Sequence, residues 1–118
     1  MSWYFWQQKY KILKDSKMAK YALIQFKINN DFFEWESAFY GAQATARKHG
    51  IVEIFHGMKS KDPSSCAILA MIDSEEQMND FMENAGDLIA KSGHILESTE
   101  VTFYENWSLT RRHFFWVN

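Results

Sequence analysis

The alternation of apolar and polar positions predicts four strands in the middle of the chain. Residues 20–28 alternate with period two, and residues 51–58 form a second short strand pattern. Residues 66–72 are a continuous apolar run, which suits a central strand. Residues 95–105 alternate again but carry apolar and acidic side chains on both faces. Neither face of this long strand therefore matches the pattern of a purely buried or a purely solvent-exposed surface.

Helical spacing predicts two helices between these strands. The first begins after Asp31, which forms a capping box with Glu34, and ends at Gly50. The second begins after the capping residue Ser74 and continues to Gly93. Their apolar stripes are Phe32, Trp35, Phe39, Ala42 and Ala46 in the first helix, and Met78, Phe81, Met82, Ala85, Leu88 and Ile89 in the second.

The resulting order β-α-β-β-α-β predicts the α+β, ferredoxin-like class, with a four-stranded antiparallel sheet and two helices on one face. The other face carries too many large apolar side chains to be exposed to solvent. Depending on which parity faces the helices, it exposes either Leu23 with Tyr21 or Ile24 with Phe26. We therefore expect a homodimer in which two such sheets pack face to face.

Two segments carry a family resemblance. The pairing of "HGIVEIFHGMKSKDP" with "SGHILESTEVTFYE" resembles the dimeric α+β barrel superfamily, and more narrowly an uncharacterised domain-of-unknown-function family seen mainly in cyanobacteria. The resemblance covers roughly residues 18–107. The superfamily includes cofactor-free monooxygenases, polyketide-tailoring enzymes, haem-degrading enzymes, isomerases and stress-induced proteins, so the fold implies little about function. The narrower family has no established activity, and the resemblance therefore implies no functional residues.

Length and composition fit one cytoplasmic domain. The chain has 118 residues, and its aromatic share of 17% is enough for a sizeable core. The single cysteine, Cys66, excludes an internal disulfide, as in proteins of a reducing compartment. No apolar run is long enough for a membrane span or a signal peptide.

Charge separates the middle from its flanks. Residues 1–17 are aromatic and basic, which suggests an N-terminal extension, with Met18 as an alternative start or the extension as a short helix on the domain. Residues 18–107 form the barrel domain, with seven basic and fourteen acidic side chains, and residues 108–118 form a basic, aromatic tail. An acidic domain argues against a nucleic-acid surface. The flanks could contact a membrane surface, but the preferred interpretation is that they pack on each other or on the partner subunit, or are disordered.

Three side chains are candidates for catalysis. His56 lies in mid-strand, in phase with Val52 and Ile54, where it could act as a general base or haem ligand, or simply bond within the sheet. His94 opens the last strand, at a pocket mouth or as a turn histidine bonded to local backbone. Tyr40 is the third candidate.

Two strand carboxylates have apolar neighbours. Glu53 lies in phase with Ile51 and Phe55, and Glu97 lies in phase with other apolar residues of the last strand. If buried, such a carboxylate has the raised pKa that acid–base catalysis needs. The preferred alternative places both at the rim of the dimer, paired with basic side chains.

A ligand pocket is the remaining candidate site, although the same side chains could be plain core. Its expected lining is Trp35, Phe39, Tyr40, Gln43, His56 and Phe81. The sequence contains no phosphate loop, dinucleotide fingerprint or metal-spaced cluster, so we expect no cofactor and no metal.

The expected function is binding of a small apolar or aromatic molecule in a cleft between sheet and helices. One alternative is a cofactor-free monooxygenase or polyketide-tailoring-like enzyme that uses His56 or His94 with Tyr40. Another is a structural or regulatory dimer without a ligand.

Overall fold

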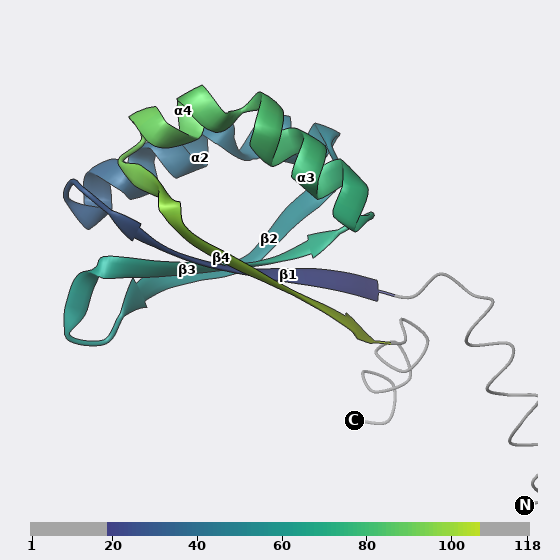
Figure 1. Cartoon of the computed structure of the whole chain (residues 1–118), viewed down its shortest axis with the longest axis horizontal. Coiled ribbons are helices and arrows are strands. Elements are labelled where there is room, and N and C mark those ends of the chain that lie inside the picture. Colours follow the sequence, from purple (N-terminus) through teal and green to yellow (C-terminus); the bar gives the residue numbers. More distant parts are fainter. Residues whose placement is uncertain (1–18, 107–118) are drawn as a thin grey trace, which may run out of the picture.

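In the computed structural model, which describes residues 19–106, helices cover one face of a four-stranded antiparallel sheet (Figure 1). The elements are β1 (Ala19–Ile28), α2 (Phe32–Lys48), β2 (Ile51–Lys59), β3 (Asp62–Ile72), α3 (Glu75–Asn84), α4 (Gly86–Lys91) and β4 (His94–Asn106). The strand order is β2-β3-β1-β4. The predicted ferredoxin-like α+β fold and the central position of β3 are confirmed. The predictions for the two flanks lie outside the described residues.

The helix starts follow their capping residues. The Asp31 carboxylate accepts a hydrogen bond from the backbone N–H of Phe33 at 3.0 Å, and the Ser74 hydroxyl accepts one from the N–H of Gln77 at 3.0 Å. Each cap satisfies a backbone donor that the first helical turn leaves free. Gly50 follows α2 with a φ of 74°, a conformation that glycine adopts without strain.

Two element predictions are wrong. The second helix is not continuous, because α3 ends at the capping residue Ala85 and α4 starts at Gly86, a residue of low helix propensity. The third strand begins at Asp62 rather than at Cys66. Asp62 accepts hydrogen bonds from the hydroxyls of Ser64 and Ser65 at 2.6 and 2.8 Å, and the polar stretch that resembles a long turn is part of the hairpin strand.

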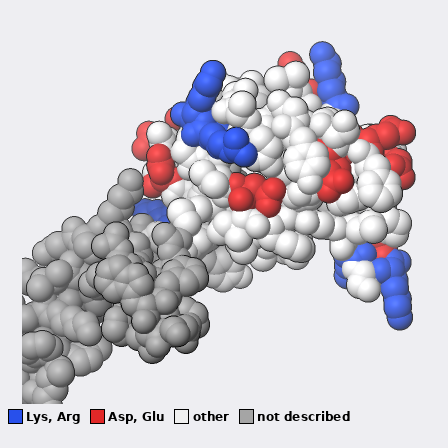
Figure 2. Space-filling view, turned by 180° about the vertical axis from the view of Figure 1, so that it is seen from behind, with Lys and Arg blue, Asp and Glu red and all other residues white. Residues whose placement is uncertain are grey.

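The core lies between the sheet and the helices. Its buried side chains are Ala22, Ile24, Phe26, Ile28, Phe32, Trp35, Cys66, Ile72 and Met78. The opposite face of the sheet has no helix over it (Figure 1). In Figure 2, which views the sheet edge-on, the visible part of the lower margin carries few charged side chains outside the β2–β3 hairpin, while charged side chains gather on the helical side. The sheet therefore presents a broad apolar surface.

Two glycines are expected to respond oppositely to alanine. Gly93 has a φ of 103°, and a Cβ there would collide with the side chain of Asn30. Gly93→Ala should lower the free energy of unfolding by about 2–3 kcal/mol. Gly41 lies inside α2 with open space around its Cβ position, so Gly41→Ala should raise stability by up to about 1 kcal/mol. Urea denaturation of both variants tests this, and equal effects would contradict it.

Candidate functional site

A β-bulge in β2 directs two polar side chains towards the helices. Glu53 lies opposite Ala70, whereas Phe55 lies opposite Leu69, so Ile54 is the extra residue. Beyond the bulge His56 lies opposite Ile68, on the helix-facing side. The prediction that His56 lies on the same face of the strand as Val52 and Ile54 is therefore wrong. His56 shares a face with Glu53 rather than with Val52 and Ile54, and Phe55 turns to the open face.

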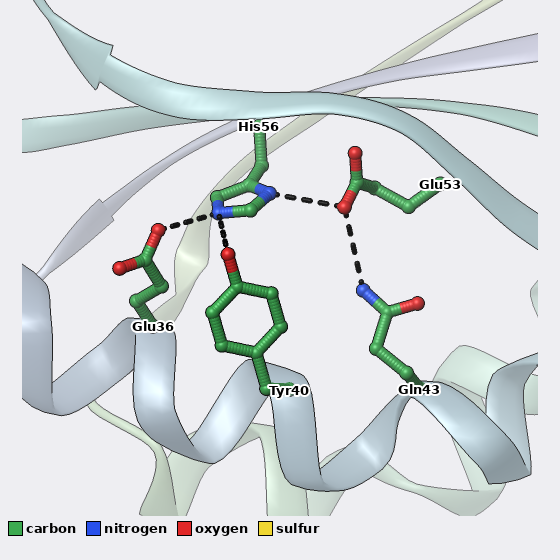
Figure 3. Close-up of polar contacts among 5 residues, drawn as sticks. All are labelled: Glu36, Tyr40, Gln43, Glu53 and His56. Carbon is green, nitrogen blue, oxygen red and sulfur yellow. Dashed lines mark hydrogen bonds and ion pairs between the residues drawn. The ribbon is translucent and has the colours of Figure 1, made fainter.

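His56 contacts two carboxylates, one on α2 and one on its own strand β2 (Figure 3). Its Nε2 lies 2.6 Å from Oε2 of Glu36, and its Nδ1 lies 3.0 Å from Oε1 of Glu53. The Tyr40 hydroxyl lies 3.5 Å from Nε2, and Gln43 donates to Oε1 of Glu53 at 3.5 Å. We call these five residues the His56 cluster. The side chain of His56 is 10% exposed, so the imidazole is largely shielded from water, whereas the Tyr40 ring is exposed.

The carboxylates govern the protonation of the cluster. Burial alone lowers the pKa of His56, but its hydrogen bonds to Glu36 and Glu53, with their negative charges, outweigh burial and raise that pKa above its ordinary value. Desolvation, followed by the charges of the same carboxylates, also raises the pKa of Tyr40. An imidazole with a raised pKa therefore lies beside a phenol with a raised pKa.

A cleft of about 420 Å³ lies beside this cluster, bounded by α2, by α3 with α4, and by the sheet. Glu53 and Gln43 line it at the side of the His56 cluster, and the other lining side chains are mostly apolar. Helix α2 packs mainly on β2, whereas α4 packs on β4. Besides two aromatic side chains and Gln43, α2 contributes five small residues to the wall, namely Ala38, Gly41, Ala42, Thr45 and Ala46. Because these side chains are short, the space between the helices stays open.

His94 also lines the cleft. Its ring stacks on Phe26 with centroids 3.9 Å apart, and Nε2 lies 2.6 Å from the hydroxyl of Thr99. Burial lowers the pKa of His94 to about 4, so the ring is neutral at physiological pH. We expected His94 either to bond local backbone or to reach a pocket mouth. Instead, its side chain bonds the side chain of Thr99 and is buried.

Four of the six expected pocket residues line the cleft. They are Trp35, Phe39, Gln43 and Phe81. Tyr40 and His56 are not among the lining residues; they contact each other, and His56 also contacts Glu53, which does line the cleft. Glu36 was not among the expected residues. Its spacing of four from Tyr40 and seven from Gln43, on one face of the helix, was the available signal.

Other candidate residues lie elsewhere. Glu97 is exposed, in a stretch where β4 leaves the regular register with β1 between Gln25 and Lys27. Cys66 is buried in the core, and burial raises the pKa of its thiol to about 11. The carboxylates of Glu36 and Glu53 approach opposite nitrogens of His56, and within residues 19–106 no group of three or more such side chains is arranged to hold a metal ion.

The fold and the sequence together define the class and the family. The protein is a ferredoxin-like α+β protein with a bulged second strand and a cleft lined by its helices and its sheet. The chain belongs to the family described as a domain of unknown function (DUF3764), whose model matches residues 19–107. The predicted membership of an uncharacterised family is thus confirmed. No curated protein matches the chain.

Solved structures share the fold at low sequence identity. A conserved protein from Methanosarcina mazei Go1 aligns with a TM-score of 0.55 and 12% identity, over 75% of this chain and 92% of its own. The monooxygenase from the gene ActVA-Orf6 of Streptomyces coelicolor, in complex with nanaomycin D, aligns with a TM-score of 0.52 and 12% identity, over 80% and 92%. A mutant form of SnoaB, a cofactor-independent oxygenase from Streptomyces nogalater, aligns with a TM-score of 0.52 and 17% identity, over 75% and 92%. These likenesses confirm the fold alone.

Within residues 19–106, no helix combines the length and the apolar character needed to cross a bilayer. The expected cytoplasmic location stays a prediction.

Proposed function

We propose that the protein binds a small apolar or aromatic molecule in the cleft between its sheet and helices. The observation that carries this is the cleft of about 420 Å³, within the size range of ligand pockets. The aromatic rings of Trp35, Phe39 and Phe81 line it, and a few polar groups lie at its sides. Such a combination of apolar walls with few polar groups is typical of small-molecule sites.

Filling the cleft from α2 tests this function. Gly41→Phe places a ring in the open space beside Gly41 and should weaken binding of the neutral fluorescent probe N-phenyl-1-naphthylamine by at least about tenfold, since the ring occupies volume that the probe needs. Gly41→Ala is the matched control and should bind like the wild type. Equal affinity in Gly41→Phe would mean that the probe binds elsewhere. Native mass spectrometry of the purified chain would show in addition whether a ligand is retained.

We further propose that a second copy of the chain covers the open face of the sheet. Val52, Phe55 and Tyr104 are 48%, 58% and 52% exposed on this side, and several half-buried side chains extend the apolar surface. Those half-buried side chains are Leu23, Leu69 and Met71. A self-complementary face-to-face dimer buries this surface with one symmetric contact.

An acid–base enzyme is the second candidate function, favoured by the His56 cluster. Tyr40 and His56 provide a phenol and an imidazole in contact, and Glu53 connects them to the cleft. Proton transfer by such groups is a common catalytic device. Two structures of similar fold are named as oxygenases, which is compatible with this candidate without establishing it.

Oxygen uptake tests the enzyme candidate. With dihydroxynaphthalenes as trial substrates, His56→Ala should abolish wild-type uptake, because it removes the group that exchanges protons with Tyr40 and Glu53. Glu97→Gln, on an exposed part of β4, should retain it. Wild-type rates in a folded His56→Ala variant would exclude His56 from the reaction.

A further inference from the structure

Glu53 presents one oxygen atom that the fold does not use. Its Oε1 receives both the hydrogen bond of Gln43 and the contact of His56 Nδ1. Within the described part of the chain, no donor contacts its Oε2, which points away from both partners in Figure 3. The carboxylate is thus held in position by one oxygen, while the other remains an acceptor on a residue that lines the cleft.

The charge around this oxygen is negative. The His56 cluster contains two carboxylates and a single imidazole, so it keeps a net negative charge even when His56 is protonated. The charged side chains among the described cleft-lining residues are Glu53 and Lys91. Lys91 is exposed, and water screens its ammonium group, whereas the side chain of Glu53 is 20% exposed. The field that a ligand meets inside the cleft is therefore mainly that of Glu53.

We propose that the cleft selects apolar molecules that carry an N–H or O–H donor, neutral or cationic, and rejects those whose polar group is an anion. In this arrangement Oε2 of Glu53 accepts the donor, while the aromatic and small side chains of the walls contact the apolar body. A carboxylate or sulfonate placed there would face the negative charge of Glu53, in a cluster whose two carboxylates outnumber its one imidazole, while the ammonium group of Lys91 is exposed and screened by water. This inference rests on the proposed binding function and adds the chemical class of the ligand.

Competition between two ions of similar size and opposite charge tests the selection. The probes are 1-naphthylmethylammonium and 1-naphthoate, each displacing N-phenyl-1-naphthylamine from the wild-type chain. We expect the cation to bind at least about tenfold more tightly than the anion, since charges a few ångströms apart in a half-buried site interact strongly.

Two variants separate direct contact from the general field. Glu53→Gln and Glu36→Gln remove the same charge and leave His56 one carboxylate partner, but only Glu53 lines the cleft. The preference should fall to within about threefold in Glu53→Gln and persist in Glu36→Gln.

Each contrary outcome has a distinct meaning. If both variants lose the preference for the cation equally, Glu53 is not the acceptor. The same conclusion follows if Glu53→Gln keeps the wild-type preference. If the wild-type chain prefers 1-naphthoate, the proposed selection against anions is refuted. This outcome needs no variant, so it can be read even if Glu53→Gln does not fold. Probe binding that survives Gly41→Phe instead refutes the cleft as the binding site, and the proposed function with it.

Discussion

Replacing His94 with Gln is expected to flatten the acid side of the pH–stability profile. In the folded protein burial holds the pKa of His94 at about 4, whereas an unfolded histidine has a pKa of about 6.5. Between these values the unfolded state binds the extra proton, so acidification favours unfolding with a slope of up to about 1.4 kcal/mol per pH unit. Over the whole window the wild type should lose roughly 3 kcal/mol more than the variant.

His56 acts in the opposite direction and in another window. Its folded pKa is raised, so its contribution to stability is fully present below the unfolded value of about 6.5 and is lost as the pH rises through the folded pKa. The two histidines together therefore favour a stability maximum near the pKa of an unfolded histidine. Urea denaturation at a series of pH values measures both limbs of the profile.

Thr99→Val is the matched control for the acid limb. It removes the hydrogen-bonding partner of His94 but keeps the buried ring on Phe26. Because burial is the cause of the lowered pKa, this variant should lose stability at every pH while keeping the wild-type slope. An equal slope in the wild type and in His94→Gln would show that His94 is accessible to protons in the folded state.

The order of elements could be predicted from the sequence because each signal is local. Asp31 and Ser74 cap their own helices, Gly50 and Gly93 adopt positive φ where the chain turns, and the strands alternate with period two. The break at Ala85 was missed because the apolar stripe continues through it, and a stripe reports which face is buried rather than whether the backbone is continuous.

The candidate site was only partly predictable because it depends on a bulge. One extra residue, Ile54, reverses the phase of β2 and brings Glu53 and His56 to the same face, although their spacing of three places them on opposite faces of a regular strand. No local signal marks such a bulge in this stretch. The partner Glu36 comes from α2, so it enters the site only through tertiary packing. The aromatic lining was predictable because helical spacing alone places Trp35 and Phe39 on the core side of α2.

Replacing Phe55 with Asp is expected to separate the proposed dimer into monomers. The bulge in β2 turns Phe55 to the open face, where it is 58% exposed and lies against Gly57. In a symmetric face-to-face dimer each substitution occurs twice, on both sides of one interface. Losing an aromatic anchor costs about 2 kcal/mol or more per site, so about 4 kcal/mol per dimer, which weakens the dimer about a thousandfold.

Phe33→Asp is the control for this change. Phe33 is 68% exposed on α2, on the opposite side of the sheet. Its substitution likewise replaces an exposed aromatic ring with a carboxylate. Native mass spectrometry and light scattering should find wild-type and Phe33→Asp dimers but Phe55→Asp monomers at the same concentration. A monomeric wild type would refute the dimer itself, whereas a dimeric Phe55→Asp variant would place the contact on another surface. Because Phe55 lies outside the cleft, its substitution should leave the affinity for N-phenyl-1-naphthylamine unchanged, which would make cleft binding a property of each single subunit.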